Sequence, residues 1–245
     1  NPHVDRLCMV AQINIDAQGR AHEAKFQPAV MRSQARLTYT RVAEALEGRP
    51  DEECQKLLPH ILLLSKVATK LLGKRLRRGA IDLDLPETQI VFEEGEPSSA
   101  TRRGRNDAHR LIEDLMLAAN EAVARYFVER ELPTLFRIHG TPDRDKLQVL
   151  LQLCESLGMD LKLSDRPAPS EIARLLEKIA DHPFGRTING LMLRSMAQAR
   201  YHPENEGHYG LAAEAYLHFT SPIRRYPDLI VHRMLKDAVA KRAPR

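Results

Sequence analysis

Residues 208–233 read HYGLAAEAYLHFTSPIRRYPDLIVHR, and they place two adjacent arginines between a predicted strand and a predicted helix. The apolar residues at positions 211, 213, 215, 217 and 219 alternate with polar or small ones, which is typical of a strand with one buried face. A Ser-Pro pair at 221–222 ends this pattern, and a Pro-Asp pair at 227–228 is typical of the first turn of a helix. The stretch therefore predicts a strand, a short turn and a helix in succession.

Arg224 and Arg225 lie in the turn between these two predicted elements. A guanidinium on a short segment between rigid elements can bind a phosphate group through two parallel hydrogen bonds with little loss of side-chain entropy. The alternative is a solvated turn in which an arginine forms a surface ion pair with Asp228, a contact that contributes little to stability. The residues alone leave both interpretations open.

The composition is that of a globular protein without a membrane span. Of the 245 residues, 43% are hydrophobic and 29% are charged, which suffices for one large or two small domains with a core. The three cysteines lie far apart and form no C-x-x-C pair, which argues against a disulfide framework or a zinc site and indicates a reducing cytoplasm. No apolar run has the length of a membrane-spanning helix, so no membrane partner is expected. The net charge of +4 permits an anionic partner.

Hydrophobic periodicity along the chain predicts a mixed α/β fold. Besides residues 211–219, strands are expected at 7–15 and 21–30, which form a hairpin, and at 81–85, 90–92 and 135–138. Helices are expected at 52–72 with Gly73 as the stop, from an Asn106 cap to about residue 130, at 143–157, at 171–180 after a Ser170 cap, and at 191–200. Residues 160–169 are the most linker-like stretch, but they prove no domain boundary.

Basic residues gather in two further places, at positions 74–78 and 102–105. Clusters of this kind suit the phosphate backbone of a nucleic acid. For the first cluster there is also a structural explanation, because cations at the C-terminal end of a helix complement its dipole. Both explanations can hold at once.

Glu113 and Asn120 form a second candidate site on the helix that Asn106 caps. They are seven residues apart, which is two helical turns, so they project from the same side of the helix beside its apolar stripe. A carboxylate and an amide in this position could bind a ribose, or Glu113 could form a structural ion pair with Arg110 or Arg194.

The chain resembles the catalytic (RNB) domain of the ribonuclease II/ribonuclease R family of 3'-to-5' exoribonucleases, and the ribonuclease R branch most closely. The resemblance begins with HFTSPIRRYPDL at 218–229 and continues through six further blocks in the family's order. These blocks are VDRLCMV (4–10), ARLTYT (35–40), RGAIDLDLPE (78–87), RNDAHRLIEDLMLAANE (105–121), LFRIH (135–139) and LMLRSMAQARYHPENEGHYGLA (191–212). The resemblance implies a mixed α/β domain with an antiparallel or mixed sheet packed against helices, of which residues 1–245 are a part.

The resemblance also implies roles for single residues. Arg224 corresponds to the arginine aimed at the scissile phosphate, and Glu113 to the glutamate that anchors the terminal nucleotide. Tyr39 corresponds to a tyrosine that stacks on a base near the 3' end, although an interfacial core tyrosine is the commoner fate of a lone Tyr. Leu83 stands where the family often has phenylalanine, which weakens that side of the base clamp. The other residues expected along the RNA path are Arg78, Asn120, Ser221 and Arg225.

Hydrolysis in this family resembles a two-metal scheme, which implies Mg²⁺ held mainly by an aspartate cluster upstream of residue 4. No metal ligand is therefore expected among these residues. The upstream segment and the flanking cold-shock and S1 domains are expected to be absent here, so the chain alone is expected to be nearly inactive. Single-stranded RNA is the expected partner, with the ribosome or the RNA-decay machinery as further partners.

Two functions follow from these expectations. One is a processive 3'-to-5' exoribonuclease that releases nucleoside 5'-monophosphates from single-stranded RNA. The other is a non-catalytic RNA-binding remnant that has lost the metal site. A purely structural helical protein would explain the periodicity but not the paired arginines.

Overall fold

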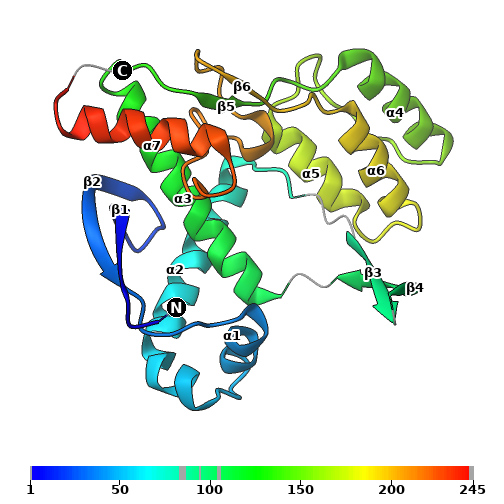
Figure 1. Ribbon diagram of the computed structural model, residues 1–245. Helices are drawn as coiled ribbons and strands as arrows, with labels where there is room; N and C mark the ends of the chain where they lie inside the picture. Colours follow the sequence, from blue (N-terminus) through cyan, green and yellow to red (C-terminus); the bar gives the residue numbers. More distant parts are fainter. Residues whose placement is uncertain (1, 83–86, 94, 104–105, 243–245) are drawn as a thin grey trace.

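The computed structural model describes residues 2–82, 87–93, 95–103 and 106–242, which form a mixed α/β domain (Figure 1). The expected fold class is confirmed. Two long helices, α2 (Glu52–Arg78) and α3 (Asp107–Val128), pack against each other in the middle of the domain. The described strands form antiparallel two-stranded sheets, not one larger sheet.

The strands are β1 (Asp5–Ile15), β2 (Ala21–Arg32), β3 (Glu87–Glu93), β4 (Glu96–Arg103), β5 (Phe136–Ile138) and β6 (Arg200–His202), which pair in sequence order. Besides α2 and α3, the helices are α1 (Tyr39–Leu46), α4 (Arg144–Ser156), α5 (Pro169–Ile179), α6 (Gly185–Ser195) and α7 (Tyr226–Val239). A short 3₁₀ turn covers Tyr209–Leu211. Among the described helices, we find none whose length and apolarity would let it cross a membrane.

The predicted N-terminal hairpin is confirmed as β1 and β2. Its turn forms because the carboxylate of Asp16 accepts the backbone N–H of Arg20 at 2.8 Å, while Gly19 takes a φ of +78°. The turn rests on α2, where the Nζ of Lys70 donates to the carbonyl of Ala17 at 2.6 Å. The hairpin is thereby fixed to the central helices.

The main core surrounds the C-terminal half of α3. Val123 and Phe127 of α3 pack there with Leu217, with Ile138 of β5 and with Leu235 of α7. Each of these side chains is 0–1% exposed. A second cluster joins α4, α5 and α6, which lie together on one side of the domain (Figure 1). The linker-like residues 160–169 contribute to this second cluster and do not separate two domains, since Leu161 and Leu163 pack against it.

Several predicted boundaries agree with the structure and others do not. Asn106 caps α3, and the helix predicted at 143–157 is confirmed as α4. The predicted Ser170 cap is wrong, because α5 begins earlier and the Glu171 carboxylate accepts the backbone N–H of Ala168 at 2.9 Å. The helix predicted at 191–200 is also wrong in its bounds. It runs from Gly185 to Ser195, and residues 200–202 instead pair with β5.

The predicted stop of α2 at Gly73 is wrong, because the helix continues to Arg78. Glycine inside a helix costs only about 1 kcal/mol relative to alanine, so other contacts can outweigh it. Here Arg75 forms a buried ion pair with Asp114 of α3 at 2.9 Å. Gly79 then ends the helix with a left-handed φ of +95°.

We expect Gly79→Ala to destabilise the domain more than Gly48→Ala. Both glycines have a positive φ, so both substitutions introduce left-handed strain of about 1–2 kcal/mol. A Cβ at Gly79 would also lie 2.7 Å from the backbone N and Cα of Ser170, whereas a Cβ at Gly48 meets nothing within 4 Å. The clash adds about 1–3 kcal/mol. Urea unfolding of both variants measures the difference, and equal losses would contradict the packing argument.

Candidate functional site

Residues 212–225, here called the site segment, connect the 3₁₀ turn to α7. The predicted strand at 211–219 is wrong, because these residues form only isolated bridges, Phe136 with Leu217 and His208 with Ala213. The expected alternation of burial is partly present, since Leu217 and Phe219 are buried. The segment is therefore held on its buried face without a continuous strand ladder.

Beyond the bridge to β5 at Leu217, side chains of α3 and α7 bind the backbone of the site segment at Phe219 and Ser221. The N–H of Phe219 donates to the Oδ1 of Asn120 at 2.9 Å. The carbonyl of Phe219 lies 2.8 Å from the Nε2 of His232, which donates to it. The N–H of Ser221 donates to the Oδ2 of Asp228 at 2.7 Å. Buried backbone groups need such partners, and here they come from two helices.

The two arginines of the turn have different surroundings. The Nη2 of Arg225 donates to the Oδ2 of Asp228 at 2.8 Å, and Asp228 is 0% exposed. The ion pair that the sequence suggested is therefore formed by Arg225, and it is not a surface pair. Arg224 is exposed, and within the described residues its guanidinium has no hydrogen bond or ion pair. Arg224 is thus the arginine of this turn that can reach a ligand.

Asn120 lies behind the site and not on its surface. It is 3% exposed, and besides accepting from Phe219 its Nδ2 donates to the hydroxyl of Tyr216 at 2.9 Å. Both ends of the amide are thus engaged within the protein. Glu113, two turns earlier on α3, is half-buried. The two residues share one side of the helix as predicted, but only Glu113 is partly accessible.

Arg78 is also engaged within the protein. Its Nη1 and Nη2 donate to the two carboxylate oxygens of Glu121 at 2.9 and 2.7 Å, and its Nη2 donates to the carbonyl of Leu211 at 3.0 Å. The hydrogen bonds with Glu121 raise the pKa of Arg78. Arg75, Arg77 and Arg78 lie in the last turn of α2, where the dipole explanation expects cations. The Arg75–Asp114 pair adds a second structural role, because it joins α2 to α3. Leu83 lies outside the described residues, as do the side chains of the second basic cluster at 102–105.

Tyr39 is the first residue of α1 and is 45% exposed. Its ring stacks on that of His109 in the first turn of α3, with ring centroids 4.0 Å apart and an interplanar angle of 16°. The imidazole is held by Asn106, whose Oδ1 lies 2.6 Å from its Nδ1. Tyr39 is therefore not a core tyrosine, and it presents an exposed aromatic surface beside α3.

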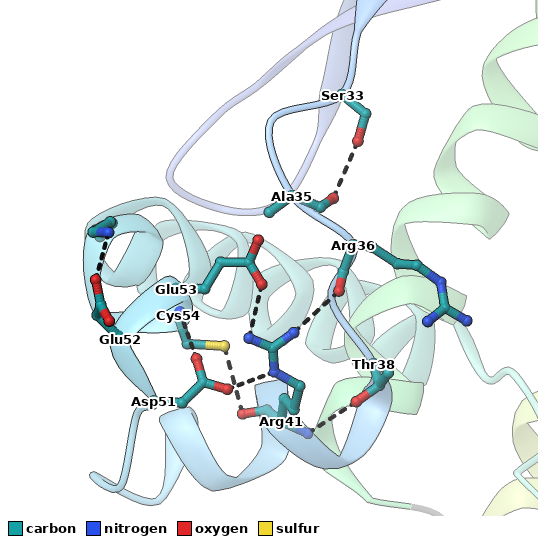
Figure 2. Close-up of polar contacts among 10 residues, drawn as sticks. Ser33, Ala35, Arg36, Thr38, Arg41, Asp51, Glu52, Glu53 and Cys54 are labelled. Carbon is teal, nitrogen blue, oxygen red and sulfur yellow. Dashed lines mark hydrogen bonds and ion pairs between the residues drawn. The ribbon is translucent and has the colours of Figure 1, made fainter. Parts of the chain in front are cut away.

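Arg41 fixes the chain around Tyr39 at the start of α1 (Figure 2). Its guanidinium binds Asp51 and Glu53 at the start of α2 and the carbonyl of Arg36, while its backbone N–H donates to the capping Thr38. The hydrogen bond from Arg41 holds the pKa of Asp51 well below its usual range. The contacts anchor both sides of Tyr39 in the sequence.

The candidate residues lie on helix α3 or contact it at successive positions along its length. Tyr39 stacks on it at position 109, Glu113 follows one turn later, and Asn120 reaches the site segment after two more turns. At 1.5 Å per residue, positions 109 to 120 span roughly 16 Å along the axis. The structure thus arranges Tyr39, Glu113 and the turn of Arg224 along one helix.

A group of half-buried histidines in and beside the site segment was missed by sequence reasoning. The rings of His139 and His208 are 4.9 Å apart, and His218 lies 2.7 Å through its Nδ1 from the hydroxyl of Tyr201. Burial lowers the pKa of His208 to about 3 and that of His218 to about 4. These histidines stand in separate blocks of the sequence, so no spacing pattern could have grouped them.

We expect the protein to lose stability in mild acid because of these histidines. A histidine whose pKa is lowered in the folded state binds protons more readily when the protein is unfolded. The free energy of unfolding therefore keeps its full value above the unfolded pKa of 6.5 and decreases as the pH falls below it. Urea unfolding at about pH 7.5 and about pH 5 should differ by on the order of 1 kcal/mol or more. His208→Gln should reduce this difference. The exposed His60→Gln serves as the control, and an equal reduction there would contradict the assignment.

Comparisons with known proteins agree with the resemblance of the sequence blocks. The chain matches the RNB domain family over residues 1–241. It is 43% identical over 244 residues to ribonuclease R of Escherichia coli (strain K12), covering 98% of this chain and 30% of that protein. The chain thus spans about a third of the curated relative's length.

Solved structures share the fold. Mycoplasma genitalium RNase R in complex with ribose methylated single-stranded RNA matches with a TM-score of 0.92 and 32% identity, over 97% of this chain and 37% of that one. Yeast Ssd1, a pseudonuclease, matches with a TM-score of 0.73 and 18% identity, over 98% of this chain and 30% of that one. The second likeness is one of fold alone.

Proposed function

Because this chain belongs to the RNB domain family, we propose that it is part of the catalytic domain of a 3'-to-5' exoribonuclease. The substrate is single-stranded RNA in the cytoplasm, degraded processively to nucleoside 5'-monophosphates. The observation that carries the proposal is the exposed Arg224, held on a turn in which the N–H of Ser221 and the Nη2 of Arg225 both bind Asp228. A relative that binds single-stranded RNA with nearly the same fold supports the choice of substrate.

Each candidate residue has a task in this proposal. The guanidinium fork of Arg224 stabilises negative charge that develops on the phosphate in the transition state. Tyr39 stacks on a base near the 3' end, and a contact of this kind contributes about 1–3 kcal/mol. Glu113 hydrogen-bonds the ribose of the terminal nucleotide. Arg225 and Ser221 bind Asp228, so they support the turn and leave the contact with RNA mainly to Arg224.

The family chemistry implies Mg²⁺, which would activate water and stabilise the leaving oxygen. Among the residues that the structure describes, no group of three or more His, Cys, Asp and Glu side chains could hold a metal ion. The described donor set does not fit the metal, and the proposal assigns no step on this chain to it.

A second candidate function is RNA binding without hydrolysis. The fold alone does not decide between the two functions, because yeast Ssd1, a pseudonuclease, shares it. The two functions differ in the product. The full-length parent protein releases nucleoside monophosphates from labelled RNA under our proposal, whereas binding without release would favour the alternative.

In the full-length parent, we expect Arg224→Lys to reduce the cleavage rate by roughly a hundredfold or more while RNA affinity changes little. Lysine keeps the charge but loses the planar fork, and an interaction made mainly in the transition state affects kcat more than binding. Single-turnover cleavage and RNA binding are measured side by side. Arg225→Lys should have a milder effect, since its partner is Asp228.

Arg233→Lys, an exposed arginine on α7, is the matched control and should cleave at the parental rate. An Arg224→Lys enzyme that cleaves normally, or that fails only through lost affinity, would contradict the catalytic role of Arg224.

We also expect discrimination between ribose and deoxyribose at the 3' end to depend on Glu113. An RNA with a 3'-terminal deoxyribose should be cleaved roughly tenfold or more slowly by the parent, because an unpaired polar partner costs about 1–3 kcal/mol. Glu113→Gln should narrow the ratio of the two rates, whereas the exposed Glu44→Gln should leave it unchanged. Equal rates on both sugars in the parent protein would refute the assignment of Glu113 to ribose.

A further inference from the structure

Asp228 is a fully buried carboxylate whose position controls the arginine turn. It lies in the first turn of α7 and is 0% exposed. A single oxygen, Oδ2, accepts the N–H of Ser221 at 2.7 Å and the Nη2 of Arg225 at 2.8 Å. These two donors are the first and last residues of the turn. Asp228 therefore fixes both ends of the segment that carries Arg224.

The middle of the turn has little packing of its own. Ile223 is 101% exposed, and Arg224 is exposed as well. The carbonyl of Ser221 accepts the N–H groups of Arg224 and Arg225 at 3.3 and 3.0 Å, so the backbone around Arg224 follows wherever Ser221 is placed. The direction of the Arg224 side chain thus depends on the anchor at Ser221.

The chain that enters the turn is anchored independently. Asn120 of α3 binds the N–H of Phe219, and His232 of α7 binds its carbonyl. These contacts end two residues before Ser221. Loss of the Asp228 carboxylate would therefore release the turn while the preceding chain stays in place.

The polar atoms around Asp228 are not arranged for stability alone. Its Oδ1, the Nε of Arg225 and the Oγ1 of Thr220 are buried, and none has a hydrogen-bond partner among the described residues. Buried polar atoms without partners destabilise a fold, and a buried ion pair is often no better for stability than apolar residues of similar volume. A role in function would account for these unpaired polar atoms.

We propose that Asp228 is a positioning residue that holds the exposed guanidinium of Arg224 in the orientation required for phosphate-ester cleavage. The inference rests on the proposed function and adds to it the residue through which the fold directs Arg224. Asp228 itself does not touch the substrate. Its removal should therefore affect kcat through Arg224 and leave RNA affinity nearly unchanged.

The test is a double-mutant cycle in the full-length parent protein, with Asp228→Ala, Arg224→Ala and the combined variant. Misplacement of a reacting group by about 1 Å can cost roughly a hundredfold, so we expect Asp228→Ala to lower the single-turnover rate by about 50-fold. In the Arg224→Ala background, the same change should cost less than about threefold, because the group it positions is gone. RNA affinity should change by less than about threefold in each variant.

Two further variants separate positioning from a general loss of structure. Asp228→Asn keeps one acceptor oxygen for the N–H of Ser221, so it should retain roughly five- to tenfold more activity than Asp228→Ala. It also carries the test if the alanine variant does not fold. Asp237→Ala, which removes a carboxylate paired with Arg242 at 3.3 Å farther along α7, should leave the rate unchanged.

The outcomes are distinct. Normal cleavage by Asp228→Ala, or equal costs with and without Arg224, would overturn the inference while the proposed function stands. Loss of activity in Asp237→Ala to the same degree would also overturn it, because the effect would then be one of α7 stability. Normal cleavage by Arg224→Ala would overturn the catalytic role of Arg224 and the inference together, whereas RNA binding without cleavage by the parent protein would overturn the proposed function. Strong coupling with unchanged affinity supports both.

Discussion

Beyond an isolated bridge to β5, the backbone of the site segment must satisfy its hydrogen bonds without a continuous strand ladder, and much of the local architecture follows from this constraint. Buried N–H and carbonyl groups without partners cost free energy comparable to lost hydrogen bonds. Asn120 and Asp228 bind two of these N–H groups, and His232 binds a carbonyl. Because the three residues lie on α3 and α7, the segment can keep its place only where these helices pack together. Both ends of the turn are therefore tied to the helix that packs on this core.

A similar constraint explains why two of the four cations in the first basic cluster, Arg75 and Arg78, are turned inward. Arg75 is 9% exposed, and a buried guanidinium is tolerated only with a carboxylate partner, which Asp114 supplies. Arg78 binds Glu121 and also the carbonyl of Leu211, just before the site segment. Two arginines that the sequence suggested for RNA binding thus connect α2 to α3 through ion pairs in the structure. A cluster of positive charge in a sequence is compatible with phosphate binding, but burial in the fold determines which of its cations remain accessible to a phosphate.

Sequence patterns predicted the elements whose signals are local. The hairpin, α3, α4 and α7 have strong periodicity together with a cap or turn residue, and the structure has all of them. The end of α2 was not predictable in this way, because helix continuation past Gly73 depends on pairing with residues about 40 positions later. Alternation in the site segment correctly indicated a buried face at Phe219, but the period of two does not reveal whether the partners are strands or side chains.

The candidate site shows the same division between local and distant signals. Tyr39, Glu113 and Arg224 were selected through family blocks, and the structure leaves each of them at least partly accessible along α3 or on the turn beside it. The family resemblance singled out Arg224, but the local pattern alone could not distinguish it from Arg225, since both lie in the same proline-flanked turn. The distinction arises because the buried Asp228 lies one helical turn after Arg225 and forms an ion pair with that arginine. The Asp228 carboxylate therefore gives two adjacent arginines different surroundings. Arg225 is bound within the protein, and Arg224 remains exposed. Since yeast Ssd1, a pseudonuclease, shares this fold, the fold alone does not make a protein a nuclease.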